Sequence, residues 1–229
     1  QVLRRADGIT TVSRFMLGEL EKFSPDVLGK TTVIWNGFDP SALEGVKAPE
    51  RDRPYGLCVG RLNRQKGQAL LMDAFETLGP RDPGFDLMFL GDGPARNGLA
   101  EKASRSPMHP YISFRGRVPH DEALGLIKGS SFLVVASETE SFGLAALEAR
   151  LLRRPIVAVS KGGVQEVLEA YPGAVWIQGD TREAFAEGMK KAINCRDIQY
   201  EPTSRFEPWE RVAKRYTDLL SKHVLRNHP

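Results

Sequence analysis

The amino-acid sequence predicts an α/β protein built on a doubly wound, Rossmann-like parallel sheet. Short runs rich in apolar and β-branched residues alternate with longer segments in which apolar residues recur at helical spacing. The short runs are apolar throughout, which is typical of parallel strands covered by helices on both faces. Six of these runs lie between residues 56 and 178, so this part of the chain is expected to form one doubly wound domain.

The predicted elements follow one another at regular spacing. Eight strands are predicted, at 8–13, 31–36, 56–60, 86–91, 111–116, 132–137, 155–160 and 174–178. Amphipathic segments predict helices, among them 67–78, 120–130, 181–193 and 208–225. The stretch 42–55 is polar, charged and contains prolines, so it is interpreted as a linker or surface loop between the first two strands and the other six.

The composition narrows the class of protein. A hydrophobic content of 41% and a charged content of 27% are typical of a folded globular chain. The net charge of +3 over 229 residues does not suggest the concentrated basic face of a nucleic-acid-binding protein. Cys58 and Cys195 lie far apart, and Cys58 falls in an apolar run, which indicates a buried free thiol and a reducing, cytoplasmic compartment.

The loop after the first strand of the domain carries two cations. In a doubly wound sheet, ligands bind beyond the carboxyl ends of the strands. In the segment 58–67, Gly60 permits a tight turn, and Arg61 and Lys66 follow it. The G-x-G-x-x-G pattern of dinucleotide-binding folds does not occur here. An arginine fork and a lysine point charge suit a diphosphate, and a solvated basic loop is the simpler alternative.

The loop after the third strand of the domain offers a different kind of candidate. Val118 and Pro119 lie on this open loop, where backbone groups could face a planar ring. His120 stands beside the predicted start of a helix, and we interpret it as a surface residue rather than a catalytic one.

The stretch SETESFGLAALEA, residues 137–149, places one glutamate before a predicted helix and another within it. Ser137 and Glu140 match the capping-box pattern, and Glu148 could face solvent, so both carboxylates have a purely structural interpretation. The apolar neighbours of Glu148 argue against a plain solvent face. A spacing of eight positions along a helix also separates the two carboxylates too widely for a catalytic dyad.

The same stretch predicts an anion site at the helix start. Phe142, Gly143 and Leu144 would leave unpaired backbone N–H groups there. A phosphate at this point would have Glu140 towards one end of the ligand and Glu148 towards the other, and carboxylates accept hydrogen bonds from sugar hydroxyls. This arrangement favours a nucleoside diphosphate that carries a sugar at each end.

Glu140 and Glu148, spaced as E-x7-E, resemble the signature of retaining GT-B glycosyltransferases of the family 4 type, also described as glycosyl transferases group 1. The segments VGRLNRQKG, FLGDGP, FRGRVPHDEALGLI and SKGGVQEVLE are similar to further blocks of that family, in the same order. ADGITTVS and VIWNGFD resemble the segment that leads out of its N-terminal domain, and FEPWERVAKRYTDLL resembles the helix that returns to it. The resemblance covers nearly the whole chain.

The resemblance implies a role for each matching residue. Arg61 and Lys66 would hold the diphosphate of the donor and stabilise the leaving group. Glu140 would contact hydroxyls of the transferred sugar, and Glu148 would bind the ribose. The residues implied for catalysis are Arg61, Lys66 and Glu140, and those implied for donor binding are Gly60, Val118, Phe142, Gly143, Leu144 and Glu148, with Val118 beside the base.

The resemblance also implies a mechanism. The sugar would be transferred with retention along a front-face, ion-pair-like path. No metal and no cofactor are expected, because arginine, lysine and the helix start supply the positive charge. The two glutamates would therefore bind and position the donor rather than act as nucleophile and acid.

A GT-B enzyme has two Rossmann-like domains, and this chain is expected to contain mainly the second. Residues 1–32 would be the end of the N-terminal acceptor domain, 33–205 the nucleotide-sugar-binding domain and 206–229 the returning helix. The chain begins at Gln1, and we expect an N-terminal portion to be missing. The fragment should bind a donor without turning it over.

The expected partners are a UDP- or GDP-linked sugar donor, a sugar, lipid-linked or other acceptor, and the missing N-terminal domain. Such transfer would serve polysaccharide, glycolipid or other glycoconjugate biosynthesis. A lipid-linked acceptor would bring the protein to the inner face of a membrane, and this contact is kept as an alternative. A non-catalytic sugar-nucleotide-binding module is the alternative. A nicotinamide oxidoreductase is disfavoured by the absent glycine pattern, and a phosphorylase would need a much longer chain.

Overall fold

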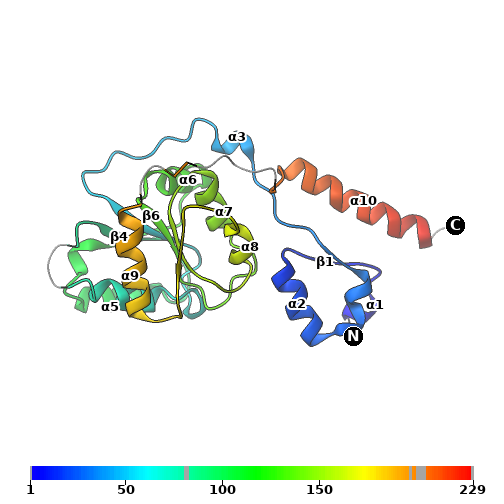
Figure 1. The fold of residues 1–229 in the computed structure, drawn as a ribbon, viewed down its shortest axis with the longest axis horizontal. Coiled ribbons are helices and arrows are strands. Elements are labelled where there is room, and N and C mark those ends of the chain that lie inside the picture. The colour runs from blue at the N-terminus through cyan, green and yellow to red at the C-terminus, as the bar shows by residue number, and fades with distance from the viewer. Residues whose placement is uncertain (1, 80–82, 196–197, 200–204, 228–229) are drawn as a thin grey trace.

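The structure is a computed structural model that describes residues 2–79, 83–195, 198–199 and 205–227, with side chains as far as residue 222. Figure 1 shows an α/β domain, a smaller N-terminal segment beside it, and a long C-terminal helix that extends over this segment. The domain contains the larger of two separate sheets, and the N-terminal segment contains the smaller.

The larger sheet has six strands, all parallel, in the order β5-β4-β3-β6-β7-β8. The strands are β3 (Tyr55–Val59), β4 (Asp86–Leu90), β5 (Ile112–Gly116), β6 (Phe132–Val135), β7 (Ile156–Val159) and β8 (Ala174–Ile177). This is the doubly wound order, and it confirms the predicted fold class. The chain runs outward from β3 to β5 and then returns to the other side of β3 for β6, so the direction of winding reverses between β3 and β6.

Helices cover both faces of this sheet. They are α4 (Gln68–Glu76), α5 (Arg96–Arg105), α6 (His120–Gly129), α7 (Leu144–Leu151), α8 (Val164–Leu168) and α9 (Arg182–Ile193). Buried residues of α4, α5 and α9 form one core with the sheet, and those of α6, α7 and α8 form another. Successive strand residues alternate between the two cores: Leu57 belongs to one, and Cys58 to the other. Two covered faces explain why most strand positions are apolar, whereas the edge strand β5 contains Ser113 and an exposed Arg115.

The N-terminal segment forms its own small sheet. β1 (Ile9–Thr11) pairs in parallel with β2 (Thr31–Val33), flanked by α1 (Val2–Arg5), α2 (Arg14–Phe23) and a 3-10 helix at Pro25–Lys30. Both strands are shorter than predicted. β1 stops early because Ser13 caps α2, its hydroxyl accepting a hydrogen bond from the Met16 N–H.

The connection to the large sheet contains a single helical turn, α3 (Pro40–Leu43). Residues 44–54 form no helix or strand, as expected for a linker. Tyr55 was included in the predicted linker, but it begins β3 and is only 1% exposed. Its hydroxyl donates to the Leu126 carbonyl oxygen at 2.7 Å, so this polar tip is satisfied inside the core.

The C-terminal helix α10 (Trp209–Asn227) confirms the predicted final helix. It begins beside the connection, where the Trp209 N–H donates to the Phe38 carbonyl at 3.0 Å. Further along, the Arg215 guanidinium donates to the Val33 carbonyl at 3.2 Å. Two links therefore tie the start of α10 to the chain that leaves the small sheet. Among the described residues, no helix is both long and apolar enough to cross a membrane.

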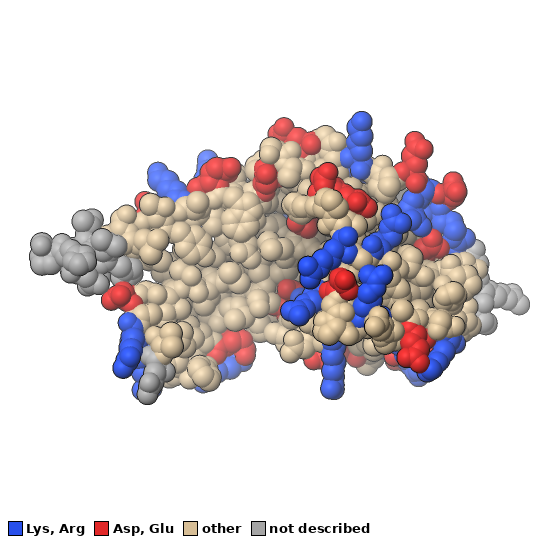
Figure 2. Space-filling model, turned by 180° about the vertical axis from the view of Figure 1, so that it is seen from behind, with Lys and Arg blue, Asp and Glu red and all other residues tan. Residues whose placement is uncertain are grey.

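The surface carries charges of both signs. Figure 2 shows lysine and arginine side chains interspersed with aspartate and glutamate over the large domain. The end that carries α10 and the N-terminal segment shows a broad area with few charges (Figure 2). This distribution agrees with the small net charge of +3.

Substitution of Cys58 tests whether its thiol is buried in the core of the large domain. It is 4% exposed within β3, and burial raises the pKa of its thiol from 9.0 to about 12, although the charge of Lys66 acts in the opposite direction. Above pH 9 the thiol ionises in the unfolded chain but stays protonated in the folded one. The free energy of unfolding should therefore fall as the pH rises from 9 towards 12.

We expect the free energy of unfolding to fall by about 1 kcal/mol more in the unmodified protein than in Cys58→Ala between pH 8 and pH 10. Urea denaturation at the two pH values measures this difference. Cys195→Ala, the other cysteine, is the control and should follow the unmodified protein. Equal losses in Cys58→Ala and the unmodified protein would contradict the prediction.

Candidate functional site

The candidate site lies where the winding of the large sheet reverses. The segments that follow β3 and β6 leave the sheet in different directions and border a cavity of about 410 Å³. Ligands bind at such switch points because the diverging loops open a crevice beyond the carboxyl ends of the strands. Eight of the predicted site residues line this cavity: Gly60, Arg61, Lys66, Glu140, Phe142, Gly143, Leu144 and Glu148.

The segment after β3 turns sharply through Gly60 and presents its two cations. The Arg61 side chain has no ion-pair partner among the residues that the structure describes, and its backbone carbonyl accepts a hydrogen bond from Gln68 at 3.0 Å. Lys66 ends a 3-10 turn (Arg64–Lys66) that is capped by Asn63, whose side chain accepts from the Lys66 N–H at 3.0 Å. Both cations therefore rest on backbone that is fixed by side-chain hydrogen bonds.

Lys66 joins the two halves of the site. Its ammonium group lies 2.7 Å from Glu140 Oε2, and the two side chains are 29% and 18% exposed. Ser137 also donates to Glu140 Oε2, at 3.1 Å. The Glu140 carboxylate is thus oriented by a residue from the segment after β3 and by one from its own segment.

The start of α7 faces the same cavity. Gly143 precedes the helix with φ +100°, and no side chain of the residues that the structure describes caps this end. The capping-box interpretation of Ser137 and Glu140 is wrong, because the helix begins at Leu144, four residues after Glu140. The first N–H groups of α7 consequently remain available to a ligand, as the sequence predicted.

Glu148 is not a plain solvent-facing residue. It lies on α7 with its side chain 22% exposed, and its Oε1 is 2.7 Å from Nε2 of His120, the first residue of α6. Its second carboxylate oxygen has no partner among the described residues. His120 is 61% exposed, which agrees with its prediction as a surface residue, but the structure also makes it a neighbour of the site.

Val118 is the one predicted site residue outside the cavity lining. It lies in the loop between β5 and α6, where it is half-buried and packs against the core formed with α6, α7 and α8. Its apolar side chain is used for packing, which leaves only its backbone for the predicted base contact.

The sequence did not identify several polar residues that line the cavity, among them Gln68 and Asn36. Gln68 is 2% exposed; its amide nitrogen donates to the Arg61 carbonyl, and its Oε1 has no partner among the described residues. The signal for Gln68 in the sequence was its polar side chain at the start of the predicted helix 67–78. Asn36 comes from the connection after the small sheet and has no local pattern that would identify it.

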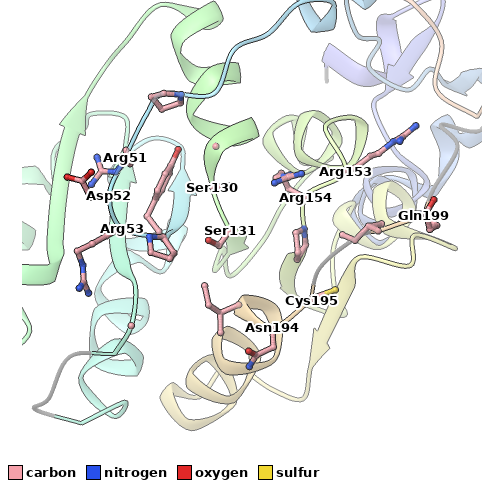
Figure 3. Close-up of a pocket in the computed structure, with 18 residues that line it drawn as sticks. Arg51, Asp52, Arg53, Ser130, Ser131, Arg153, Arg154, Asn194, Cys195 and Gln199 are labelled. Atoms are coloured by element: carbon pink, nitrogen blue, oxygen red, sulfur yellow. The ribbon is translucent and has the colours of Figure 1, made fainter.

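A second cavity, of about 800 Å³, lies at the opposite edge of the sheet (Figure 3). Arg51 and Arg53 stand on one side of it, with Arg153 and Arg154 on the other (Figure 3). Although this cavity is larger, Arg51 and Arg53 both pair with Asp86, at 3.2 and 3.0 Å. We assign the ligand to the smaller cavity, because it combines the carboxyl ends of the strands, a helix start, the Lys66–Glu140 pair and the Arg61 side chain, which has no ion-pair partner among the described residues.

No group of three or more histidine, cysteine, aspartate or glutamate residues within the described ranges could hold a metal ion. The electrostatic groups that face the smaller cavity are thus side-chain cations, carboxylates and the N–H groups of α7. Such a set can bind a diphosphate through Arg61 and Lys66 and hydroxyl groups through the carboxylates.

The sequence of this chain matches a known protein family. Residues 43–207 match the family described as "Glycosyl transferases group 1". This match covers more than half of the chain, so the chain belongs to the glycosyl transferases group 1 family.

Curated relatives carry the same family resemblance. The chain is 30% identical over 195 residues to an uncharacterised glycosyltransferase of Methanocaldococcus jannaschii, covering 85% of this chain and 52% of that protein. It is 31% identical over 221 residues to a glycogen synthase of Mycobacterium tuberculosis, covering 93% of this chain and 53% of that protein. The chain thus spans about half the length of these curated relatives.

Solved structures share the fold. The Anabaena protein HepE, determined in complex with UDP and glucose, superposes with a TM-score of 0.78 at 20% identity over 96% of this chain and 64% of that one. A sucrose-phosphate synthase of Thermosynechococcus elongatus gives a TM-score of 0.76 at 21% identity, over 98% of this chain and 60% of that one. These likenesses confirm the GT-B type of fold.

Gly67 allows a test of the close contact between the segment after β3 and the segment after β6. It follows Lys66 directly, has φ +69°, and a Cβ atom there would lie 2.0 Å from the Ala136 carbonyl oxygen. We expect Gly67→Ala to lower the free energy of unfolding by at least about 2 kcal/mol, because both the backbone angle and the contact become unfavourable. Urea denaturation measures this loss.

Gly98→Ala is the matched control, since Gly98 lies within α5 and a Cβ atom there meets nothing within 4 Å. It should raise the free energy of unfolding by up to about 1 kcal/mol through helix propensity. Equal effects of the two substitutions would show that the contact between Gly67 and the segment after β6 does not constrain the site.

Proposed function

We propose that this chain is the donor-binding part of a retaining GT-B glycosyltransferase of the family 4 type, which transfers a sugar from a UDP- or GDP-linked donor. One observation carries the proposal: Lys66, Glu140 and the uncapped start of α7 meet in one cavity at the switch point of the sheet. A diphosphate needs positive charge and N–H donors, and a sugar needs hydrogen-bond acceptors. This cavity offers both within one ligand's length.

The proposed roles follow from position. Arg61 and Lys66 hold the two phosphates, and the N–H groups at Gly143 and Leu144 complete the anion site. Glu140, already oriented by Lys66 and Ser137, accepts hydrogen bonds from the transferred sugar. Glu148 accepts them from the ribose through the oxygen that His120 does not occupy.

The proposed reaction breaks the bond between the sugar C1 and the diphosphate oxygen, which keeps the electron pair. The acceptor hydroxyl forms the new bond to C1 on the same face, and its proton passes to the departing phosphate oxygen. Arg61, Lys66 and the helix start stabilise the charge that grows on this oxygen. This distribution of charge needs neither a metal nor a glutamate nucleophile.

The proposed domain boundaries remain those expected from the sequence. Residues 1–32 end the N-terminal acceptor domain, 33–205 bind the nucleotide sugar, and 206–229 return to the N-terminal domain. The acceptor, whether a sugar, a lipid-linked intermediate or another molecule, is held mainly by the part of the protein that this chain does not contain. We propose a cytoplasmic enzyme of glycoconjugate biosynthesis, whose activity requires that part.

Isothermal titration with UDP, GDP and ADP tests donor binding. We expect UDP or GDP to bind, and Lys66→Ala to weaken that binding about 10- to 100-fold, because it removes a charge-assisted hydrogen bond to phosphate. Lys190→Ala, on the exposed side of α9, is the control and should leave the affinity unchanged. Equal affinities in all three proteins would contradict the diphosphate site.

The ribose contact has a separate test. A nucleoside diphosphate without the 2′ and 3′ hydroxyls should bind about 10- to 100-fold more weakly than UDP to the unmodified protein, because Glu148 loses its hydrogen bonds. Glu148→Ala should bind the two nucleotides equally. A persistent preference for UDP in Glu148→Ala would assign the ribose to another residue.

Turnover distinguishes an enzyme from a non-catalytic binding module. A longer protein that includes the N-terminal domain should release nucleotide from the donor when an acceptor is supplied, and Lys66→Ala in that protein should not. Donor binding without turnover in the longer protein would favour the binding module.

A further inference from the structure

Glu166 makes three hydrogen bonds to parts of the chain far away in sequence. It lies in the short helix α8, and its Oε1 accepts from the Phe15 N–H at 2.8 Å. Its Oε2 accepts from the Arg14 N–H and from the Trp35 indole N–H, both at 3.0 Å. One carboxylate of the large domain thus holds both the N-terminal segment and the connection that leads from it.

The two backbone contacts of Glu166 fall at the start of α2. Arg14 and Phe15 are the first two residues of this helix, so their N–H groups have no partner within it. A carboxylate is favoured at this positive end of the helix. Ser13 caps this same first turn, and its hydroxyl donates to the Ser141 carbonyl at 2.6 Å. The start of α2 is therefore bonded to the large domain at two points.

Both of these attachment points, Glu166 and Ser141, are connected to the Glu140 loop, which we define as residues 140–143. Ser141 belongs to this loop directly. Glu166 reaches it through the turn at Gly162 and Gly163 that begins α8, where the Gly163 N–H donates to the Glu140 carbonyl at 2.7 Å. A Cβ atom on Gly163 would lie 2.2 Å from the Ser141 carbonyl oxygen, so loop and turn are in close backbone contact.

A buried arginine fixes α8 to α7, the helix that follows the Glu140 loop. Arg150 of α7 is 2% exposed and donates to the carbonyls of Val167 and Glu169 at the end of α8. The Glu140 loop, α7 and α8 are consequently joined at both ends of α8. A displacement of Glu166 is therefore expected to move the Glu140 loop as well, because α8 is bonded to the rest of this unit at both of its ends.

We propose that Glu166 is a positioning residue that couples the Glu140 loop to the start of α2, so that donor binding and attachment of the N-terminal segment stabilise each other. The proposal rests on the proposed function for its assignment of the Glu140 loop to the donor. Residues 1–32 are the proposed end of the acceptor domain, and Glu166 then links the donor site to the orientation of that domain. By linkage, each event must strengthen the other by the same factor.

Amide hydrogen exchange, followed residue by residue by NMR, tests the coupling without any ligand. In Glu166→Ala the amides of Arg14 and Phe15 lose their acceptor and should exchange at least about tenfold faster. The coupling predicts that exchange at Gly163 and Leu147 also accelerates, because their N–H groups donate to the Glu140 loop. Amides of β3 and β6 should keep their rates, which shows that the domain remains folded.

The neighbouring substitution Gln165→Ala is the matched control, since Gln165 lies on the same helix and its side chain bonds, within the described part of the chain, only to Ser160. It should change none of these rates. Glu166→Gln keeps one acceptor oxygen and should give rates between those of Glu166→Ala and the unmodified protein. Acceleration at Arg14 and Phe15 alone, with Gly163 and Leu147 unchanged, would overturn the proposal.

Nucleotide titration provides the second arm. UDP or GDP, whichever binds, should slow the exchange of Phe15 in the unmodified protein and should bind about five- to tenfold more weakly to Glu166→Ala. Equal affinity for the two proteins would overturn the coupling. If neither nucleotide binds the unmodified protein, the assignment of the donor fails, and the ligand-free exchange rates still decide whether Glu166 couples the two segments.

Discussion

The reversal of winding between β3 and β6 is the constraint on which the rest of the structure depends. Because these adjacent strands are parallel, their carboxyl ends meet at one edge, and their following segments diverge to opposite faces of the sheet. This divergence brings a basic loop from one side and a helix start from the other to the same cavity. Lys66 and Glu140 then join across the gap, so the chemistry of the site is a consequence of the strand order.

Close backbone contact gives this edge of the sheet its shape. Gly67 lies against Ala136, Gly91 against Gly60, and Gly163 against Ser141, each at a distance that excludes a Cβ atom. Side chains are kept out of these contacts, and the charged groups project from a scaffold with little freedom to shift. Such rigidity suits a site that must orient a ligand at several points, because less order has to be imposed on binding.

Local patterns predicted much of this protein. Apolar runs and helical periodicity located the six strands and the main helices, and the residues around E-x7-E located the cavity. Contacts between distant residues were not predictable, because no local pattern records them: His120 meets Glu148 across 28 positions, and Glu166 meets Arg14 across 152. The capping-box interpretation failed for a related reason, since the pattern at Ser137 and Glu140 was satisfied by an ion-pair arrangement with Lys66 instead of by a helix end.

The surroundings of Trp35 have an optical consequence. Its indole N–H is bonded to the Glu166 carboxylate, and the guanidinium carbon of Arg205 lies 4.6 Å from the ring centroid. Trp176 and Trp209 are 37% and 44% exposed, whereas the Trp35 ring contacts two charged groups of the protein, Glu166 and Arg205. The junction between the N-terminal segment and the large domain therefore contains its own fluorophore, and movements there can be followed by light without attaching a label.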